Sequence, residues 1–324
     1  EIIDYKPWYL SNHYNFRAVN NPKYDRFLIR SLYRLAKLPG RLISLNRKFA
    51  FDRFRDEQLR LSSKRYIDNN DLKADCPVAD IHIAGSDQIW NTLFENGKDP
   101  AFYLDFVPAS KRKIAYAASF GSDHVLEAYI DFVKNMAAHI DYVSVRELSG
   151  IRILENLGIR NVVHVADPVF LLDAREWDAI ADETFSEEYI LVYDTEKSDT
   201  LKQVAQSLSH RLNLPVYSAG SFALNYAKRN FQYSGPSTFV SLVKNARYVI
   251  SNSFHGTAFA LIYEKNMAVV GRAENINSRM EGLLQYLGII ERLVDAKVNI
   301  QGIILPLKYD QINKKLKHFI DSSK

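Results

Sequence analysis

Short apolar runs alternate with longer amphipathic segments over most of the chain, from residue 78 onward. The runs have strand length and predict two series of strands: 78–84, 113–119, 141–145 and 162–166, then 189–193, 214–218, 247–250 and 267–270. Between them, apolar residues recur at helical spacing and predict helices at 125–138, 147–157, 197–212, 236–246, 254–264, 276–287 and 309–321. Gly158, directly after the second of these helices, is typical of a helix end.

Strands that alternate with helices in this way favour parallel sheets covered by helices on both faces. The two series are separated near residues 167–175. We therefore predict an α/β protein of two doubly wound, Rossmann-like domains that face a cleft. The amino-terminal domain would cover residues 1–170 and the carboxy-terminal domain residues 171–324.

A basic stretch precedes this regular pattern. Residues 24–37 and 44–61 carry apolar residues at helical spacing with Arg and Lys between them, and Leu38-Pro39-Gly40 predicts a break between two amphipathic helices. Residues 23–65 contain 13 Lys or Arg and four acids, a net charge of +9 in a chain whose total is +4. Such a field attracts an acidic lipid surface, a phosphorylated substrate or nucleic acid, whereas a solvated pair of helices is the alternative. Nucleic acid is disfavoured because no recognisable binding module accompanies the charge.

Composition narrows the class of protein. The chain is 47% hydrophobic and 25% charged with only 13 Gly and 10 Pro, which excludes disordered and collagen-like classes. The single cysteine, Cys76, excludes a disulfide framework and a thiolate zinc site, and it fits a reducing compartment. No apolar run approaches the roughly 18–20 residues of a membrane span. The phosphate-loop, dinucleotide and zincin motifs are missing from the sequence. We expect a cytoplasmic enzyme or binding protein without a metal.

Polar groups follow the predicted strands of the first series, where open α/β sheets bind ligands. Asp87 follows 78–84 and suits a base or an acceptor of a sugar hydroxyl, although a turn signature is equally consistent. Gln88, Trp90 and Ser119 lie nearby at strand ends, and Trp90 offers either a face for a sugar ring or a core residue.

Arg146 follows 141–145 directly and should leave the sheet at the ligand rim. Its guanidinium suits bidentate binding of a carboxylate or phosphate. The alternative is an ion pair with a neighbouring acid such as Glu147.

The segment after 247–250 places a histidine at the start of a helix. Ser253 can cap this helix, His255 lies in its first turn, and Gly256 with the small residues after it would leave room for a ligand. A helix amino terminus favours bound phosphate or carboxylate, and His255 can donate a hydrogen bond or transfer a proton. A packing histidine at a tight turn is the alternative.

Taken in order, the motifs resemble the polysaccharide pyruvyl transferase family. The match extends from Glu1 to about Val294, and it rests on five phrases together with the late segment Ser278–Leu284. The phrases are Gly85-Ser-Asp-Gln-Ile-Trp-Asn91, Ala115-Tyr-Ala-Ala-Ser-Phe-Gly121, Ser144-Val-Arg-Glu147, Asp167-Pro-Val-Phe-Leu-Leu172 and Ser251-Asn-Ser-Phe-His-Gly-Thr-Ala258.

The chain departs from the family pattern in two places. Members usually begin with a strand, an Asn-Tyr-Gly turn and a helix that are missing here, so we expect Ile2–Asp4 to be the second strand of its sheet in the natural order. Several members have Arg-Leu-His where this chain has Ser253-Phe254-His255, and Arg279 or Arg272 would then supply the basic group.

The resemblance implies a transferase with two Rossmann-like domains, similar to the two-domain GT-B glycosyltransferases. Phosphoenolpyruvate would be the donor substrate, no cofactor or metal would be needed, and the product would be a pyruvate ketal that bridges two sugar hydroxyls of a cell-surface polysaccharide. The residues that fit donor binding are Arg146, Ser253, His255, Gly256 and Arg279. Those that fit acceptor binding are Asp87, Gln88, Trp90 and Ser119, with His255 and Asp87 as the catalytic pair.

The expected acceptor is a glycan or a lipid-diphosphate-linked sugar. Residues 23–65 would then contact an anionic membrane, with the protein peripheral at its inner face. A sugar-nucleotide-dependent glycosyltransferase of the same architecture and a non-catalytic glycan-binding protein are the rival functions.

Overall fold

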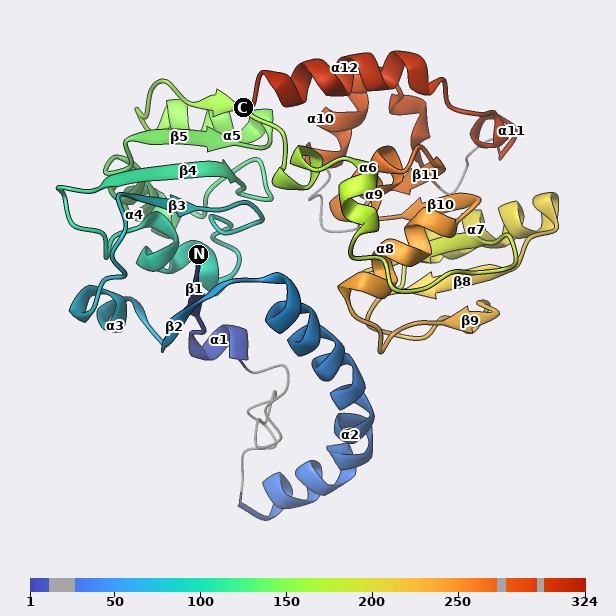
Figure 1. Cartoon of the computed structure of the whole chain (residues 1–324), viewed down its shortest axis with the longest axis horizontal. Coiled ribbons are helices and arrows are strands. Elements are labelled where there is room, and N and C mark those ends of the chain that lie inside the picture. Colours follow the sequence, from blue (N-terminus) through green and yellow to red (C-terminus); the bar gives the residue numbers. More distant parts are fainter. Residues whose placement is uncertain (12–26, 273–277, 296–299) are drawn as a thin grey trace.

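Two parallel sheets, one in each half of the chain, form the frame of the computed structural model, which describes residues 1–11, 27–272, 278–295 and 300–324 (Figure 1). The amino-terminal sheet has the order β3-β4-β5-β6, with all neighbours parallel. Its strands are β3 (Ile81–Ala84), β4 (Arg112–Ala118), β5 (Tyr142–Val145) and β6 (Val163–His164). Each lies within or next to a predicted strand.

The carboxy-terminal sheet has the order β12-β11-β10-β7-β8-β9, again with all neighbours parallel. Its strands are β7 (Ile190–Tyr193), β8 (Val216–Ala219), β9 (Arg229–Asn230), β10 (Tyr248–Ser251), β11 (Asn266–Val270) and β12 (Leu293–Val294). Counted from β7, this is the Rossmann order 3-2-1-4-5-6. Successive strands are added on one side of β7 up to β9 and on its other side from β10 onward, so the strand order reverses between β7 and β10. Ligands bind at that switch point, so the segments after β7 and β10 are the first place to look for a site.

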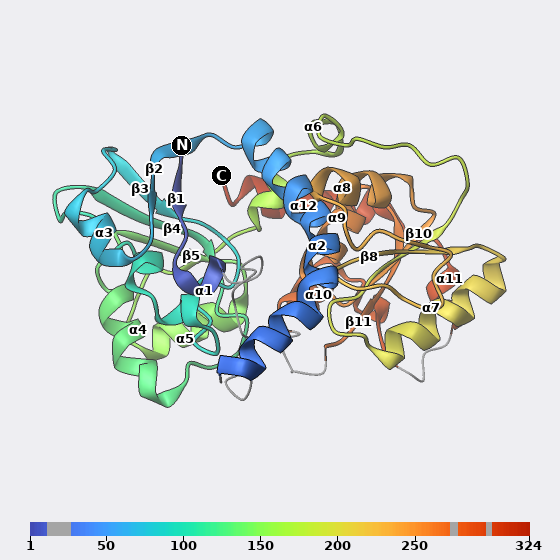
Figure 2. The ribbon, with the colours of Figure 1, turned by 90° about the horizontal axis from the view of Figure 1, so that it is seen from below.

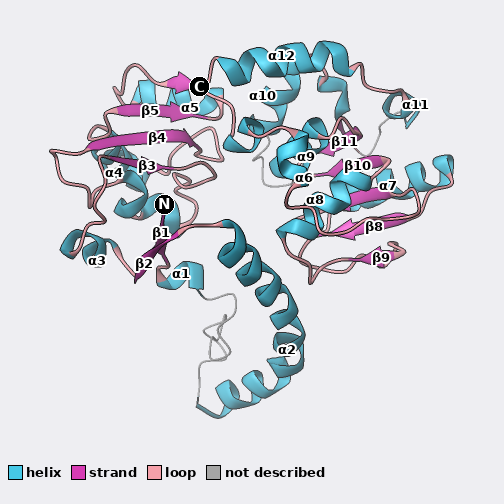
Figure 3. Cartoon of the chain, viewed as in Figure 1, coloured by secondary structure: helices cyan, strands magenta, loops and turns pink. Residues whose placement is uncertain are grey.

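Helices cover both sheets, as predicted (Figure 3). They are α4 (Ile130–Ala137), α5 (Leu148–Asn156), α6 (Ala174–Asp178), α7 (Asp199–Leu212), α8 (Pro236–Asn245), α9 (Phe254–Ile262), α10 (Ser278–Leu287), α11 (Ile300–Ile304) and α12 (Tyr309–Asp321). Gly158 follows α5 with φ of 84°, the left-handed conformation that glycine allows at a helix end. Apolar clusters lie on both faces of the carboxy-terminal sheet, which explains its nearly continuous apolar strands.

The beginning of the chain forms a separate pair of strands. β1 (Ile2–Tyr5) pairs in parallel with β2 (Leu61–Tyr66), close to the short helices α1 (Trp8–Ser11) and α3 (Asn69–Ala74). β2 was not predicted because its polar sequence lacks the apolar run of the other strands.

The prediction of two basic helices separated at Leu38-Pro39-Gly40 is wrong. A single helix, α2 (Phe27–Gln58), passes through this point, and Figure 1 shows it as one curved element. A proline inside a helix removes one main-chain hydrogen bond and bends the helix, but the turns on either side keep their own bonds. Residues 24–26 of the first predicted helix lie outside the described residues.

One segment of each half, α2 and the end of α12, packs on the other half of the molecule. Arg47 of α2 donates hydrogen bonds from Nη1 to the carbonyls of Gly220 at 2.8 Å and Gln232 at 3.0 Å, both in the carboxy-terminal half. Figure 2 shows α2 lying across the region between the two halves. Just after α12, the Ser323 hydroxyl accepts a hydrogen bond from the Ala166 N–H at 2.8 Å. The two sheets are thereby held on either side of one site.

Candidate functional site

The site lies where the carboxyl ends of strands from both sheets meet. A cavity of about 70 Å³ opens there. Its amino-terminal wall includes Asp87 and Gln88, and its carboxy-terminal wall includes Ser253, His255, Arg272 and Arg279. The end of β10 and the first turn of α9 thus face the loop after β3, as the switch-point rule predicts.

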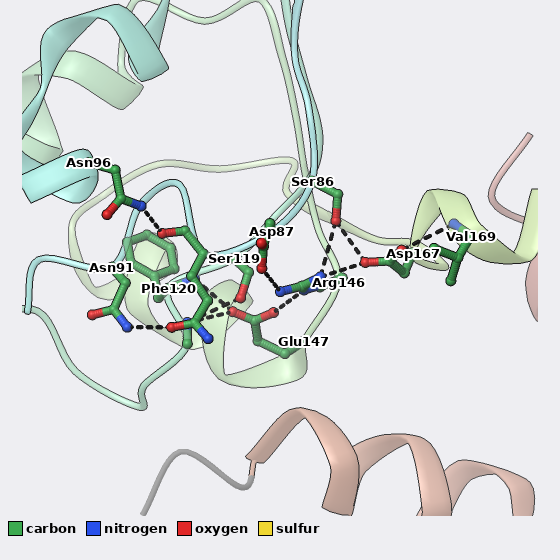
Figure 4. A network of polar contacts seen from close by, with 12 residues as sticks. Ser86, Asp87, Asn91, Asn96, Ser119, Phe120, Arg146, Glu147, Asp167 and Val169 are labelled. Atoms are coloured by element: carbon green, nitrogen blue, oxygen red, sulfur yellow. Dashed lines mark hydrogen bonds and ion pairs between the residues drawn. The ribbon is translucent and has the colours of Figure 1, made fainter. Parts of the chain in front are cut away.

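Arg146 is the centre of an ionic network at the end of β5 (Figure 4). Nη1 donates to Asp167 Oδ2 at 2.5 Å and to Ser86 Oγ at 3.3 Å, and Nη2 donates to Asp87 Oδ1 at 3.0 Å. The Arg146 side chain is completely buried. Its outer nitrogens are therefore committed to carboxylates, and Asp87 and Asp167 are its principal partners rather than the sequence neighbour Glu147, whose Oε2 lies 3.9 Å from Nε.

A second arginine joins the network from the carboxy-terminal half. The guanidinium carbons of Arg146 and Arg279 lie 4.9 and 5.8 Å from the centre of the Phe254 ring, so both cations contact the same aromatic side chain. Arg279 is 7% exposed, and no acid lies within 4 Å of its guanidinium among the described residues. Burial, together with the nearby Arg146 cation, lowers the pKa of Arg279 to about 10. A buried cation without a close acidic partner among the described residues favours the binding of an anion.

Glu147 links Arg146 to the loop after β4. Its Oε1 accepts hydrogen bonds from the Phe120 N–H at 2.8 Å and the Gly121 N–H at 3.4 Å, while its Oε2 is buried without a hydrogen bond. Burial raises the pKa of the Glu147 carboxyl against the opposing pull of the two arginines. Glu147 thus fixes the loop after β4.

Asp87 occupies a turn with φ of 74°, and its side chain remains open to the cavity. Burial of the carboxyl opposes ionisation, but the Arg146 cation and the Gln88 backbone outweigh it and hold the pKa of Asp87 below its usual range. An ionised Asp87 accepts hydrogen bonds and does not serve as a proton donor at neutral pH.

His255 lies in the first turn of α9, in the position predicted for it. Burial is the main reason that its pKa is lowered, and Arg146 and Arg279 act in the same direction, while Asp167 and Asp87 oppose them. The imidazole makes no hydrogen bond to any described residue. It is therefore a neutral base at pH 7 whose ring nitrogens are available to a substrate.

Two expectations about the start of α9 are wrong. Ser253 stands at the cap position, but its hydroxyl makes no capping bond, so it is left at the cavity wall. Gly256 faces the sheet instead of a ligand, because a Cβ there would lie 2.2 Å from Ser251 Oγ. The small residues Gly256, Thr257 and Ala258 let α9 pack closely on β10.

Two of the four residues predicted to bind the acceptor are also buried. Trp90 is fully buried, stacks on Tyr103 with ring centres 5.3 Å apart and donates to the Phe102 carbonyl at 3.0 Å. It therefore has no face for a sugar, and the core alternative is correct. Ser119 is fully buried too, and its Oγ accepts a hydrogen bond from the Gly121 N–H. Gln88 does line the cavity, beside Asp87.

Asp167, Glu147 and Phe254 form much of the site, although the sequence did not single them out as functional. The signals available were the Asp-Pro step after a predicted strand and the Arg-Glu pair after another, but neither identifies the partner of a side chain. No group of three or more His, Cys, Asp or Glu side chains that could hold a metal occurs among the described residues. In the same described residues, no helix is long and apolar enough to cross a bilayer.

Several solved structures are similar to the chain in part. The accessory secretory protein 1, 2 and 3 structure of Streptococcus pneumoniae has 12% identity and a TM-score of 0.37, and the match covers 79% of this chain but only 56% of that one. UDP-GlcNAc 2-epimerase of Methanocaldococcus jannaschii has 10% identity, a TM-score of 0.39 and coverages of 78% and 72%. A putative UDP-N-acetylglucosamine 2-epimerase of Listeria monocytogenes has 10% identity, a TM-score of 0.42 and coverages of 79% and 70%.

A comparison with curated proteins finds none that matches the chain. The family described as polysaccharide pyruvyl transferase matches residues 1–274, which include the strand ends that carry Asp87, Arg146 and His255. Its extent agrees with the motifs from Gly85 to Ala258. The chain belongs to the polysaccharide pyruvyl transferase family.

Proposed function

We propose that the protein transfers the pyruvyl group of phosphoenolpyruvate to two hydroxyls of one sugar and forms a pyruvate ketal. The carbon that bears the phosphate loses its bond to the phosphate oxygen and gains bonds to the two sugar oxygens. The methylene carbon takes up one proton and becomes a methyl group. The two hydroxyls release two protons, of which one balances this methyl group and the other leaves with the phosphate.

The observation that carries the proposal is the Arg279 cation, which is buried beside Arg146 with no acid within 4 Å of it in the part of the chain that the structure describes. Phosphoenolpyruvate bears a carboxylate and a phosphate, so it can offer this guanidinium the negative charge that the protein does not. The amino terminus of α9 faces the same cavity and adds free N–H groups and a partial positive charge. Arg146 contributes to the field, although its outer nitrogens already bind Asp87 and Asp167.

His255 and Asp87 would divide the proton chemistry on the acceptor side. A neutral imidazole takes the proton of an attacking hydroxyl and can return it to the methylene carbon. The ionised Asp87 accepts a hydrogen bond from a sugar hydroxyl and orients it toward the donor. Both side chains line the same cavity, so one diol can reach both. The reaction so described needs no cofactor from outside the chain.

The proposed acceptor is a glycan, either free or linked to a lipid diphosphate. Leu42 and Phe49 on α2 are each about half exposed, at 52% and 57%, within a helix that carries more Lys and Arg than acids. A basic helix with exposed apolar side chains suits the surface of an anionic membrane. This part of the proposal places the protein at the membrane where such acceptors are anchored.

The test is direct. The protein is incubated with phosphoenolpyruvate and a panel of methyl pyranosides, and phosphate release is measured together with the NMR signal of a ketal methyl group. We expect both products with at least one pyranoside, and much less of both with Arg279→Met at a phosphoenolpyruvate concentration below saturation. In parallel, thermal melting should show stabilisation by phosphoenolpyruvate and none by UDP- or GDP-sugars. Stabilisation by a sugar nucleotide alone would favour a glycosyltransferase and overturn the proposal.

A further inference from the structure

A second cavity adjoins the site on the opposite side of His255. It has a volume of about 220 Å³ and lies between α2 and the carboxy-terminal sheet. Five aromatic side chains line it: Phe51, Tyr193, Phe231, Phe239 and Phe259. His255 lines both this aromatic pocket and the cavity that holds Asp87 and Arg279. The histidine therefore stands between the two cavities.

α2 is a fixed wall of the aromatic pocket. Arg47 binds the Gly220 and Gln232 carbonyls, and its guanidinium carbon lies 5.2 Å from the centre of the Phe51 ring. Gly235, at the start of α8, touches the same helix: a Cβ on this glycine would lie 3.0 Å from Ala50 Cβ. Only a residue without a side chain lets the helix approach this closely. Phe51 is therefore held over the pocket by contacts on both sides.

The chemistry of the wall differs from that of the donor cavity. Arg47 is the only cation on it among the described residues, and its Nη1 already serves two carbonyls, so nothing there suits a trianion. The aromatic faces offer an apolar surface, and the Tyr193 hydroxyl, which makes no hydrogen bond to a described residue, offers one donor and one acceptor. Apolar faces with a few polar groups at the rim are typical of sites for small organic ligands.

The volume of the aromatic pocket limits the size of the ligand that it can hold. Pockets for drug-sized ligands usually measure roughly 300–1,000 Å³, so this smaller pocket suits one ring better than an oligosaccharide. A pyranose has an apolar C–H face for the aromatic rings and hydroxyls for the Tyr193 oxygen, Ser234 and His255. A polyprenyl chain would leave those polar groups without partners.

We propose that the aromatic pocket binds the acceptor pyranose, with its apolar face on the aromatic rings and its diol directed at His255. This assignment rests on the proposed function, because it places the acceptor ring beside His255, with its diol reaching the cavity that Asp87, Arg279 and the donor would share. It also replaces Trp90 and Ser119, which are buried, as the sugar-binding residues.

Two Phe residues of α2 give a matched pair for the test. Phe51 is 42% exposed and lines the pocket, whereas Phe49 is 57% exposed and does not line it. With methyl pyranosides as lipid-free acceptors, Phe51→Ala should raise the acceptor KM about tenfold, while the KM for phosphoenolpyruvate changes less than twofold. Phe49→Ala should change neither value. Tyr193→Phe removes only a hydroxyl and should also raise the acceptor KM, which keeps the test valid if Phe51→Ala folds poorly.

Saturation-transfer NMR with the same pyranosides separates this inference from the proposed function. If pyranoside binding depends on Phe51 but phosphoenolpyruvate neither binds nor reacts, the pocket assignment stands and the proposed reaction is wrong. If the ketal forms and both Phe51→Ala and Tyr193→Phe keep the acceptor KM of the natural protein, the pocket assignment is overturned. A rise in the KM for phosphoenolpyruvate instead of the acceptor KM would overturn it as well.

Discussion

Replacing Arg279 by Met should separate stability from donor binding, because the charge of this residue is unfavourable to the folded protein alone. Burial and Arg146 lower the pKa of Arg279 to about 10. Each pKa unit corresponds to about 1.4 kcal/mol, so keeping this cation buried costs on the order of 3 kcal/mol. Methionine has a similar length and helix propensity, and it carries no charge that must be desolvated.

Arg279→Met should therefore leave the free energy of unfolding unchanged or raise it by about 1–3 kcal/mol. The same change removes a charged hydrogen-bond donor from the donor cavity, and phosphoenolpyruvate affinity should fall by about 1.5–3 kcal/mol. That loss corresponds to roughly 10- to 150-fold in Kd.

Denaturant unfolding and titration calorimetry with phosphoenolpyruvate measure the two quantities in the same variant. Arg279→Lys is the control, because it keeps the charge and loses the planar fork, and its affinity should lie between those of the other two proteins. A destabilised Arg279→Met protein that binds phosphoenolpyruvate normally would refute both the electrostatic argument and the place of Arg279 in the donor site.

Three further changes test the remaining features. Arg146→Ala leaves Asp167 buried without its partner and should lower the free energy of unfolding by about 3–5 kcal/mol, and wild-type stability in denaturant unfolding would contradict the network. His255→Gln should lower kcat by about 10²–10⁴-fold with phosphoenolpyruvate affinity kept, whereas lost binding with near-normal turnover at saturating donor would make His255 an anion anchor only. Because the folded-state pKa of His255 lies below its unfolded value, protonation favours unfolding as the pH falls from about 6.5, so thermal melting of His255→Gln should decline less between pH 7 and 5 than that of the natural protein. Vesicles with phosphatidylglycerol should bind the protein at 0.1 M salt and release it at 1 M, where the screening length falls from about 10 Å to about 3 Å. Substitution of Leu42 and Phe49 by Ser should weaken this binding, and equal binding to neutral vesicles would refute the charge argument.

The regular part of the fold was predictable because its residues face one environment. β7 and β10 consist mostly of apolar residues that are buried on both faces of a parallel sheet, and α12 has the bounds that its apolar spacing predicts. α2 and β2 were not predictable in the same way. The Pro39-Gly40 pair is a strong local turn signal, yet the helix continues through it, and β2 pairs through its main chain without an apolar run.

The positions of the site residues were predictable, whereas their partners were not. Arg146 follows a strand and His255 begins a helix, so the sequence places both at the ligand rim. That Arg146 binds Asp167 instead of a ligand depends on β6 lying beside β5, which no local pattern contains. Trp90 shows the same limit, because a tryptophan after a strand suits a sugar platform and a core equally well.

Because α2 and the end of α12 each bind the other half of the molecule, the protein should tolerate cleavage between the two halves. α2 is bound to Gly220 and Gln232 of the later half, and Ser323 after α12 is bound to Ala166 of the earlier half. The connection around Asp182–Thr184 is exposed and offers a protease a place to cut. After cleavage there, the two fragments should remain associated, because each still contacts the other through these hydrogen bonds. Expressed separately, residues 1–170 and 171–324 would each present an uncovered contact surface, and mixing the two should restore solubility and turnover.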